Sequence, residues 1–278
     1  MRIVMPLFDF DYKDSQEFVF GKGEYALRKF IAHKEVPLAP SYPGFSEADI
    51  SCMESATWAL VAENTDLKNA PELYKAEVAR LLLSFKICKL THLFIKYRLC
   101  KDNIHVCARL GEEMHYISPA VEPITCADLR VINNRFVSLS EMETVSNRTY
   151  NAMYFIYRGY HSEKPMVTFM LLMIAIEAFF SNEKRKGMTE TICSRVSKFL
   201  GCKARCEYTD IEKLYDLRSK IVHGKFKVPD EIKSPSETLD KLCELEYVLR
   251  ECMKKMLDEK IYLKYGTVEE KEKYFNDL

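Results

Sequence analysis

The sequence predicts an α+β protein, in which a mixed α/β N-terminal region precedes an all-helical C-terminal bundle. Apolar residues alternate at the period of strands between positions 93 and 110, and from position 140 onward they recur at helical spacing. Of the 278 residues, 47% are hydrophobic and 12% aromatic, which suffices for packed cores and excludes intrinsic disorder. The low glycine content and the absence of a GxGxxG or P-loop pattern argue against nucleotide-binding folds of those kinds.

The first half of the chain mixes the two patterns. In order, the predicted elements are strands at 2–10 and 17–20, helices at 48–62 and 71–88, and a β-hairpin over 93–110. The hairpin is predicted because apolar residues alternate on both sides of the turn Lys101-Asp102-Asn103. The proline-containing passage 118–125 favours a domain boundary, so we expect an N-terminal region over 1–125, from which we draw no function.

The second half is a series of helices with explicit start signals. The predicted helices are 141–160, 164–181, 189–200, 210–223 and one that follows Ser234. Capping boxes are predicted at Ser140 with Glu143, at Thr209 with Glu212 and at Ser234 with Glu237, and Pro235 suits a first helical position. Helices joined by short loops predict a compact bundle over 135–265, and the charged tail 266–278 is expected to add a short helix.

Charge and hydropathy favour a cytoplasmic protein without membrane contact. The chain has 41 basic and 41 acidic side chains, so it lacks the overall basic excess of proteins that coat nucleic acid or anionic membranes. Its N-terminus lacks the pattern of a secretory signal. The most apolar stretch, Met166 to Phe180, has about fifteen residues, fewer than the roughly 20 of a membrane span, and is predicted to be a buried helix.

The ten cysteines are expected to be reduced thiols. Two groups approach metal-ligand spacing, namely Cys193, Cys202 and Cys206, and Cys88, His92, Cys100, His105 and Cys107. The first group lacks a second Cys/His pair at zinc-finger spacing, and the second is looser. We therefore interpret these thiols as small buried hydrophobes and expect neither metal nor cofactor. A metal-dependent enzyme that uses the second group is the competing hypothesis.

The segment LYDLRSKIVHG, residues 214–224, is the strongest candidate for chemistry. Arg218 and His223 would lie about 140° apart around a regular helix, but Gly224 predicts that the helix ends there, which lets the imidazole leave the helical track. Arginine binds phosphate as a charged fork and histidine exchanges protons near neutral pH, so the pair suits an anionic ligand. The alternative is that the arginine is merely exposed and that the histidine only interacts favourably with the dipole at the C-terminal end of the helix.

Glu177 lies in the very apolar sequence LLMIAIEAFF, residues 171–180. Burying a carboxylate without a partner is costly, so a cation or a hydrogen-bond donor is expected to reach it. Arg218 and Lys220 are the natural candidates. The alternative is that Glu177 points outward at the edge of its helix.

Together, the IEAFF helix, the basic helix that follows it and LYDLRSKIVHG resemble the HEPN superfamily, specifically its Apea-like branch. The resemblance covers roughly residues 140–260, and its most specific part is the Arg-x4-His pattern of Arg218 and His223, with Tyr215 before it and Gly224 after it. This resemblance implies that the chain is a metal-independent endoribonuclease that acts in defence or stress response. It also implies a composite active site at the two-fold axis of a homodimer.

The resemblance implies a role for each residue of the pair. His223 would assist proton transfer as the ribose 2′-hydroxyl attacks the adjacent phosphate, and Arg218 would stabilise charge on the phosphoryl oxygens. The internal nucleophile explains why RNA rather than DNA would be cut, leaving a 2′,3′-cyclic phosphate and a 5′-hydroxyl. Supporting roles are expected for Glu177, Ser219 and Tyr215, and RNA contacts for Lys220 and Lys225.

One residue departs from the family pattern, and one feature of charge agrees with it. Catalytic members often have Asn, Asp or His directly after the arginine, whereas Ser219 can form hydrogen bonds but cannot carry charge. This departure favours the alternative, a catalytically inactive HEPN-like module for nucleotide or RNA binding or for dimerisation. Conversely, residues 183–227 hold twelve basic and six acidic side chains, a net of +6 that suits contact with a phosphate backbone.

Overall fold

The computed structural model describes residues 2–35, 46–63, 71–100, 103–110, 121–162, 164–182, 187–201, 206–225 and 235–278. Contacts divide the chain into two compact units, Met1–Val137 and Ser138–Leu278, and the division falls within helix α4 (Cys126–Val145). The protein is α+β, as the sequence predicts, and its C-terminal unit is helical.

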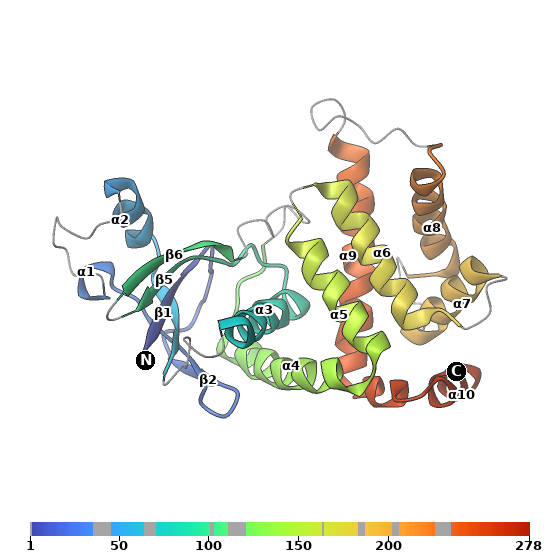
Figure 1. Ribbon diagram of the computed structural model, residues 1–278, viewed down its shortest axis with the longest axis horizontal. Helices are drawn as coiled ribbons and strands as arrows, with labels where there is room; N and C mark the ends of the chain where they lie inside the picture. Colours follow the sequence, from blue (N-terminus) through green and yellow to red (C-terminus); the bar gives the residue numbers. More distant parts are fainter. Residues whose placement is uncertain are drawn as a thin grey trace. The chain divides into compact units, whose positions relative to one another are not determined.

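The N-terminal unit is built on a six-stranded antiparallel sheet with the order β2-β3-β4-β1-β5-β6 (Figure 1). Its strands are β1 (Ile3–Phe8), β2 (Phe18–Phe20), β3 (Tyr25–Lys29), β4 (Trp58–Ala62), β5 (Phe94–Cys100) and β6 (Asn103–Leu110). All six residues of the central strand β1 are buried, which explains its continuous apolar sequence. Pro6 cannot donate to a ladder, and the register of β1 against β5 shifts between Val4 and Leu7, around this proline.

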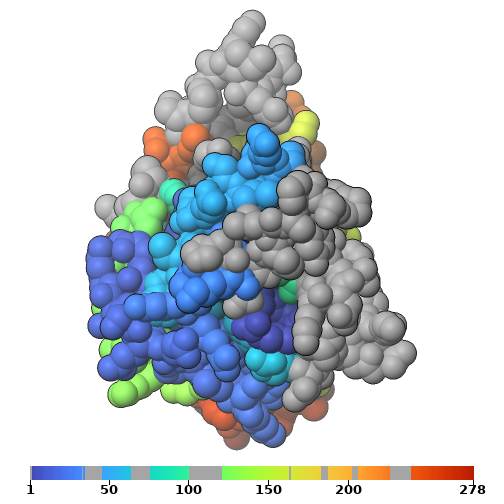
Figure 2. Space-filling model, turned by 90° about the vertical axis from the view of Figure 1, so that its left-hand side faces the viewer, coloured from blue at the N-terminus to red at the C-terminus, as the bar shows by residue number. Residues whose placement is uncertain are grey.

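Apolar side chains cover both faces of this sheet. On one face, Leu60 of β4 packs in a common core with Phe85 of α3 (Pro71–Cys88) and with residues at the start of α4. On the other, Val61 shares a core with Met53 of α2 (Glu47–Glu54), which follows the short helix α1 (Ala32–Glu35). Figure 2 views the unit from the side of α1 and α2. The sheet is therefore the middle of three layers.

Most of the predicted elements of the first half are confirmed. β1 and β2 form where strands were predicted, α3 has the predicted bounds, and Cys100 pairs with Asn103 at the end of the β5–β6 hairpin. The predicted helix 48–62 is wrong in its second part, because α2 ends at Glu54 and Trp58–Ala62 is a strand. Periodicity cannot separate a short apolar strand that is buried on both faces from a buried helix.

The C-terminal unit packs its helices around α6. The elements that follow α4 are α5 (Asn147–Tyr160), α6 (Pro165–Phe180), α7 (Met188–Leu200), α8 (Tyr208–Val222), α9 (Pro235–Asp258), the 3₁₀ helix η1 (Ile261–Tyr265) and α10 (Val268–Asn276). Helix α6 contacts α5, α7, α8 and α9 (Figure 1). It runs antiparallel to α5, since Arg148 Nη1 donates to the Ala178 carbonyl at 3.2 Å and Thr168 Oγ1 donates to the Gly159 carbonyl at 3.0 Å.

The predicted succession of helices is confirmed, as are the short helix in the tail and Pro235 as the first residue of α9. Two predicted starts are wrong. Ser140 lies inside α4, and the break comes at Ser146, which caps α5. Thr209 lies inside α8, whose reciprocal capping pair is Glu207 with Asp210. The Ser234 cap lies outside the described residues. None of the helices in the described ranges has the combination of length and apolar character that a membrane span requires.

Candidate functional site

Helix α8 carries the LYDLRSKIVHG segment, and its apolar spacing decides which side chains face the bundle. Ile211, Leu214 and Tyr215 are buried, at positions i, i+3 and i+4. The next position of this face is i+7, which is Arg218. The same periodicity that packs the helix therefore turns Arg218 toward the bundle, where α8 contacts α6 and α7.

On α6, the Glu177 carboxylate joins two side chains of α8. Tyr215 Oη donates a hydrogen bond to Glu177 Oε1 at 2.7 Å, and Arg218 Nε lies 3.1 Å from the same oxygen. The side chains of Arg218 and Glu177 are 26% and 23% exposed, so this cluster lies at the edge of the bundle rather than in its centre. The carboxylate thus has both a donor and a cation, and the cation is Arg218 rather than Lys220.

Tyr215 and Arg218 contact the Glu177 carboxylate in different ways, one as a neutral donor and the other as a cation. Burial raises the pKa of Tyr215 well above its ordinary value, and the hydrogen bond and charge of Glu177 raise it further, while Arg218 lowers it. The phenol is therefore a neutral donor at physiological pH.

Among the described residues, Arg218 Nε is buried and its N–H makes no hydrogen bond, so its contact with Glu177 is an ion pair. The closest contact of the guanidinium with the carboxylate is through Nε, and its terminal amino groups make no hydrogen bond with the described part of the chain.

His223 lies at the end of α8, as Gly224 predicts. The N–H of Gly224 donates to the Ile221 carbonyl at 3.2 Å, and that of Lys225 donates to the Lys220 carbonyl at 2.8 Å. Together with the φ of +67° at Gly224, these bonds form a Schellman motif. His223 is the C-cap and is exposed. Within the described ranges, its imidazole makes no hydrogen bond or ion pair.

The other predicted site residues lie on the outer surface of α8. Lys220 is exposed and forms an ion pair with Asp216 at 2.6 Å, and Lys225 is exposed just beyond the helix. Ser219 is half-buried, and its carbonyl accepts the His223 N–H at 3.0 Å. The structure therefore brings Glu177, Tyr215 and Arg218 together but makes no contact between them and Lys220 or Lys225.

Ion pairs also reduce the basic excess expected between residues 183 and 227. The structure describes Arg195, Lys198, Lys213, Arg218, Lys220 and Lys225 of the basic residues in this segment. Four of these form ion pairs, with Glu272, Asp210, Glu177 and Asp216. The remaining two, Lys198 and Lys225, are exposed.

The proposed metal ligands fall partly outside the described side chains, which do not include those of Cys100, His105, Cys107 and Cys202. Where the structure describes side chains, no group of three or more His, Cys, Asp or Glu is placed to hold a metal ion. Cys193 and Cys206 are buried, and burial raises the pKa of Cys193 to about 11. These two thiols pack as small apolar groups.

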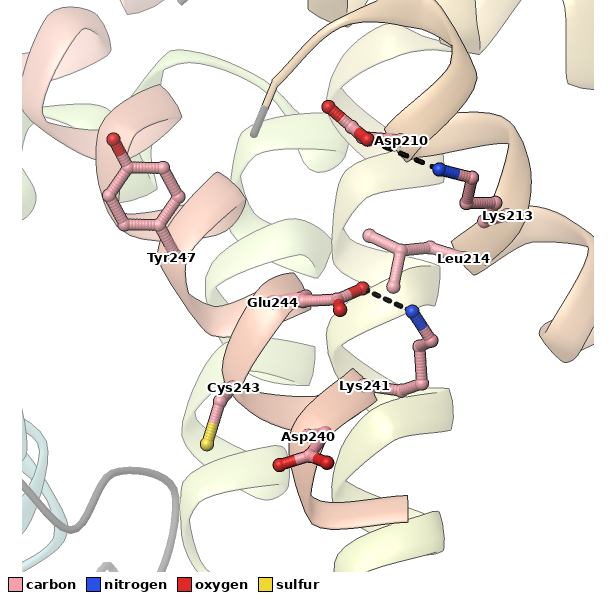
Figure 3. Close-up of a pocket in the computed structure, with 8 residues that line it drawn as sticks. All are labelled: Asp210, Lys213, Leu214, Asp240, Lys241, Cys243, Glu244 and Tyr247. Carbon is pink, nitrogen blue, oxygen red and sulfur yellow. Dashed lines mark hydrogen bonds and ion pairs between the residues drawn. The ribbon is translucent and has the colours of Figure 1, made fainter. Parts of the chain in front are cut away.

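A pocket on another face of α8 was not indicated by the sequence. It has a volume of about 460 Å³ and is lined by Asp210, Lys213, Leu214, Asp240, Lys241, Cys243, Glu244 and Tyr247 (Figure 3). Its two lysines are paired within the pocket, Lys213 with Asp210 at 3.6 Å and Lys241 with Glu244 at 2.7 Å. The lining comes from the consecutive helices α8 and α9 and includes neither Arg218 nor His223.

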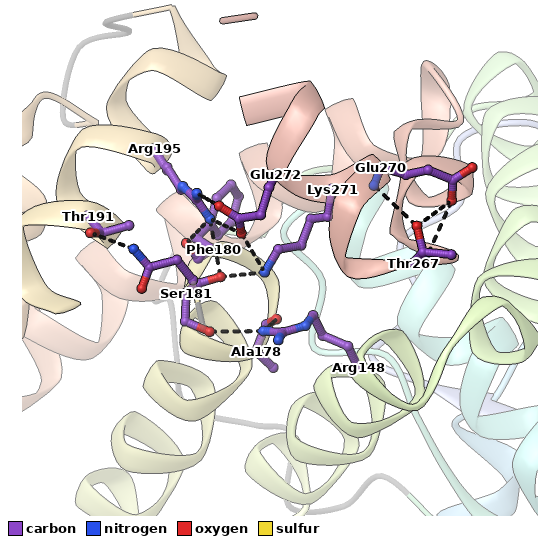
Figure 4. Close-up of polar contacts among 11 residues, drawn as sticks. Arg148, Ala178, Phe180, Ser181, Thr191, Arg195, Thr267, Glu270, Lys271 and Glu272 are labelled. Carbon is purple, nitrogen blue, oxygen red and sulfur yellow. Dashed lines mark hydrogen bonds and ion pairs between the residues drawn. The ribbon is translucent and has the colours of Figure 1, made fainter. Parts of the chain in front are cut away.

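Three cations gather at the C-terminal end of α6, one turn beyond Glu177 (Figure 4). Arg148 Nη1 donates to Ser181 Oγ at 2.9 Å, Arg195 Nη1 donates to the Ser181 carbonyl at 3.2 Å, and the buried Lys271 donates to that carbonyl as well. Both terminal nitrogens of Arg195 also bind Glu272 of α10. These contacts satisfy the free carbonyl end of α6 and its dipole, and so anchor the helix that carries Glu177.

Comparisons of the chain with family models, with curated proteins and with solved structures find no match.

Proposed function

We propose that the C-terminal unit is an Apea-like HEPN module and that the chain is a metal-independent endoribonuclease, active as a homodimer in defence or stress response. The observation that supports this proposal best is the cluster of Glu177, Tyr215 and Arg218 near the end of a helix capped by His223. The carboxylate orients Arg218 through Nε, which leaves its terminal amino groups for a phosphate. His223 is exposed and can exchange a proton with a ligand.

The chemistry requires no metal. One His223 imidazole accepts the proton of a ribose 2′-hydroxyl, whose oxygen then forms a bond to the adjacent phosphorus. The bond from phosphorus to the 5′-oxygen breaks, and the leaving oxygen takes a proton from the imidazolium of the second protomer's His223. Arg218 donates hydrogen bonds to the phosphoryl oxygens as their negative charge grows. The products are a 2′,3′-cyclic phosphate and a 5′-hydroxyl.

The surface of α6 supports the dimer. A helix that is apolar all round is expected to be buried, and Glu177 is the one charged residue of Pro165–Phe180. Yet Val167 is 45% exposed, and Met170, Leu171 and Ile174 are only half-buried. A second copy of the chain would cover these residues and bring its own Arg218 to the same face.

The second candidate function is an inactive RNA-binding or nucleotide-binding module of the same fold. Two observations favour it: Glu177 already neutralises much of the charge of Arg218, and Ser219 stands where catalytic relatives of the family often have a more polar or charged residue. In that case Arg218 and His223 would bind a phosphate without catalysing its transfer.

The deciding experiment is an RNA cleavage assay in EDTA with wild-type protein, Arg218→Ala, His223→Ala and Lys198→Ala. Lys198 is an exposed cation on α7 and is the matched control for loss of positive charge. We expect cleavage by the wild type and by Lys198→Ala, and loss of at least about 100-fold in the two site variants. Equal cleavage by all four proteins would refute the site. An inactive wild-type dimer that still binds RNA through Arg218 would establish the second candidate.

A separate substitution tests whether the proposed activity requires the dimer. Val167→Glu places a charge on the exposed apolar face of α6, outside the Glu177 cluster. We expect this variant to be a folded monomer in light scattering and to lose cleavage. A fully active monomer would refute the composite site.

A further inference from the structure

Helix α5 exposes a stripe of polar and aromatic side chains that the packing of the bundle does not need. The stripe consists of Asn147, Tyr150, Asn151, Tyr154 and Arg158, all of which are exposed. Tyr150 is 55% and Tyr154 44% exposed, although tyrosine usually buries most of its ring. The opposite face of α5 is buried in the unit. We call this set the α5 stripe.

Contacts along the helix hold one of the two rings in place. The guanidinium of Arg158 lies over the Tyr154 ring, 5.5 Å from its centroid, and Arg158 Nε donates to Tyr154 Oη at 3.2 Å. The Phe155 ring packs edge-on against Tyr154, with centroids 5.6 Å apart. Tyr150 lies one turn earlier, about 6 Å along the axis. Two aromatic rings and one cation are therefore presented in a row.

The charge of α5 suits a polyanion. Residues 147–160 contain two arginines and neither Asp nor Glu, in a chain where 29% of residues are charged. Arg158 forms no ion pair with any residue that the structure describes. Glu143 of α4 approaches the helix, but its carboxylate accepts the Tyr157 hydroxyl at 2.9 Å, beside the stripe rather than on it.

From this geometry we propose that the α5 stripe is a stacking platform for single-stranded RNA, an inference that rests on the proposed function and adds the path of the substrate. Tyr150 and Tyr154 stack on successive bases, since any base offers a π-face to an aromatic ring. Arg158 contacts a phosphate, and Asn147 and Asn151 donate or accept hydrogen bonds at base edges. A second copy of the chain is the poorer occupant, because homodimer interfaces are more apolar than this stripe and α6 offers an aliphatic face for that purpose.

The test measures binding without cleavage. A fluorescent single-stranded DNA of about twelve nucleotides lacks the 2′-hydroxyl and cannot be cut by the proposed chemistry, so anisotropy reports affinity alone. We expect Tyr150→Ala and Tyr154→Ala each to raise Kd by about 5- to 100-fold. Tyr150→Phe keeps the ring and is expected to stay within two-fold of the wild type. Arg158→Gln is expected to lower the slope of log K against log salt by about 0.7.

Light scattering on the same samples separates the outcomes. Wild-type affinity in both alanine variants, or no binding by the wild type, would overturn the platform. Weaker binding that accompanies dissociation of a dimer would overturn it as well, because it would assign the α5 stripe to a second copy. Failure of the proposed function is a different result, namely binding through the stripe without cleavage of RNA by the wild-type protein.

Discussion

Replacing Glu177 by glutamine tests the reasoning about the cluster directly. The variant keeps the shape of the side chain but removes the charge that binds Tyr215 Oη at 2.7 Å and Arg218 Nε at 3.1 Å. A hydrogen bond to a charged group contributes about 1.5–3 kcal/mol and a neutral one about 1 kcal/mol. The ion pair adds at most about 1 kcal/mol, because both side chains are about one quarter exposed. We therefore expect Glu177→Gln to lower the free energy of unfolding by about 0.5–3 kcal/mol.

The assay is urea denaturation at pH 7, followed by circular dichroism at 222 nm. The only tryptophan, Trp58, lies in the N-terminal unit, so its fluorescence reports that unit separately. The matched control is Glu212→Gln, the same substitution on the exposed face of α8, which is expected to stay within about 0.5 kcal/mol of the wild type. In a double-mutant cycle, Glu177→Gln and Tyr215→Phe should couple by more than about 0.5 kcal/mol. Additive effects, or a Glu177→Gln variant as stable as the wild type, would refute the reasoning.

The same cluster predicts a dependence on alkaline pH. Because the pKa of Tyr215 is raised in the folded state, its contribution to stability is present below the ordinary value of 10.0 and is lost as the pH rises above it. Tyr215→Phe is therefore expected to be less stable than the wild type at pH 7 and to approach it between about pH 10 and 12. A stability difference that stays constant over this range would contradict the assignment.

Three further substitutions test the packing and the polar contacts, each by urea denaturation. Gly224→Ala is expected to cost about 1–2 kcal/mol, because φ is +67° and an L side chain is strained there; no loss would contradict the Schellman end. Gly159→Ala is expected to cost about 1–3 kcal/mol, since its Cβ would lie 2.8 Å from Leu172 Cδ2, and Leu172→Ala in the same chain should make the added methyl tolerable. Burial raises the pKa of Glu272, but the hydrogen bond and charge of Arg195 lower it more, so the net pKa is lowered. The stability that the Glu272 carboxylate contributes is therefore present above pH 4.5 and is lost as the pH falls through the lowered pKa. Glu272→Gln is thus expected to be less stable than the wild type at pH 7, by a deficit that shrinks as the pH falls below 4.5, whereas a deficit that stays constant as the pH falls would contradict the ion pair.

Local patterns sufficed to predict several parts of the candidate site. A carboxylate in an apolar helix needs a donor or a cation, which predicted Arg218 or Lys220 as the partner of Glu177, and in the structure the partner is Arg218. Gly224 predicted the end of α8 because few residues other than glycine adopt a positive φ at that position. The helical spacing of Ile211, Leu214 and Tyr215 also agrees with the face that α8 buries.

Other features depend on tertiary contacts that no local pattern encodes. Arg195 meets Glu272 only because α10 folds back, 77 residues later in the chain, onto α6 and α7. The strand Trp58–Ala62 is decided by its pairing with β1 and β3 on its two edges and by the apolar cores that cover both of its faces. Ser140 and Glu143 have the spacing of a capping box inside α4, where the backbone donors are already paired within the helix.

The pocket and the α5 stripe were missed for related reasons. The pocket combines residues of α8 and α9, and only the fold shows that these side chains line one space. The stripe is visible in the sequence as Tyr150, Tyr154 and Arg158 at intervals of four, but that spacing also occurs on buried faces. Exposure distinguishes the two cases, and exposure follows from which face of α5 packs against α6.

The central claim is that the ribose 2′-hydroxyl is the nucleophile at a site built from Arg218 and His223. The most direct measurement compares, in EDTA, the cleavage of an RNA oligonucleotide with that of the same oligonucleotide carrying one 2′-deoxy sugar at the cleaved position. We predict a 2′,3′-cyclic phosphate and a 5′-hydroxyl from the RNA, no cut at the 2′-deoxy position, and no cleavage of either by His223→Ala. Cleavage at the 2′-deoxy position, or cleavage that survives His223→Ala, would contradict the claim.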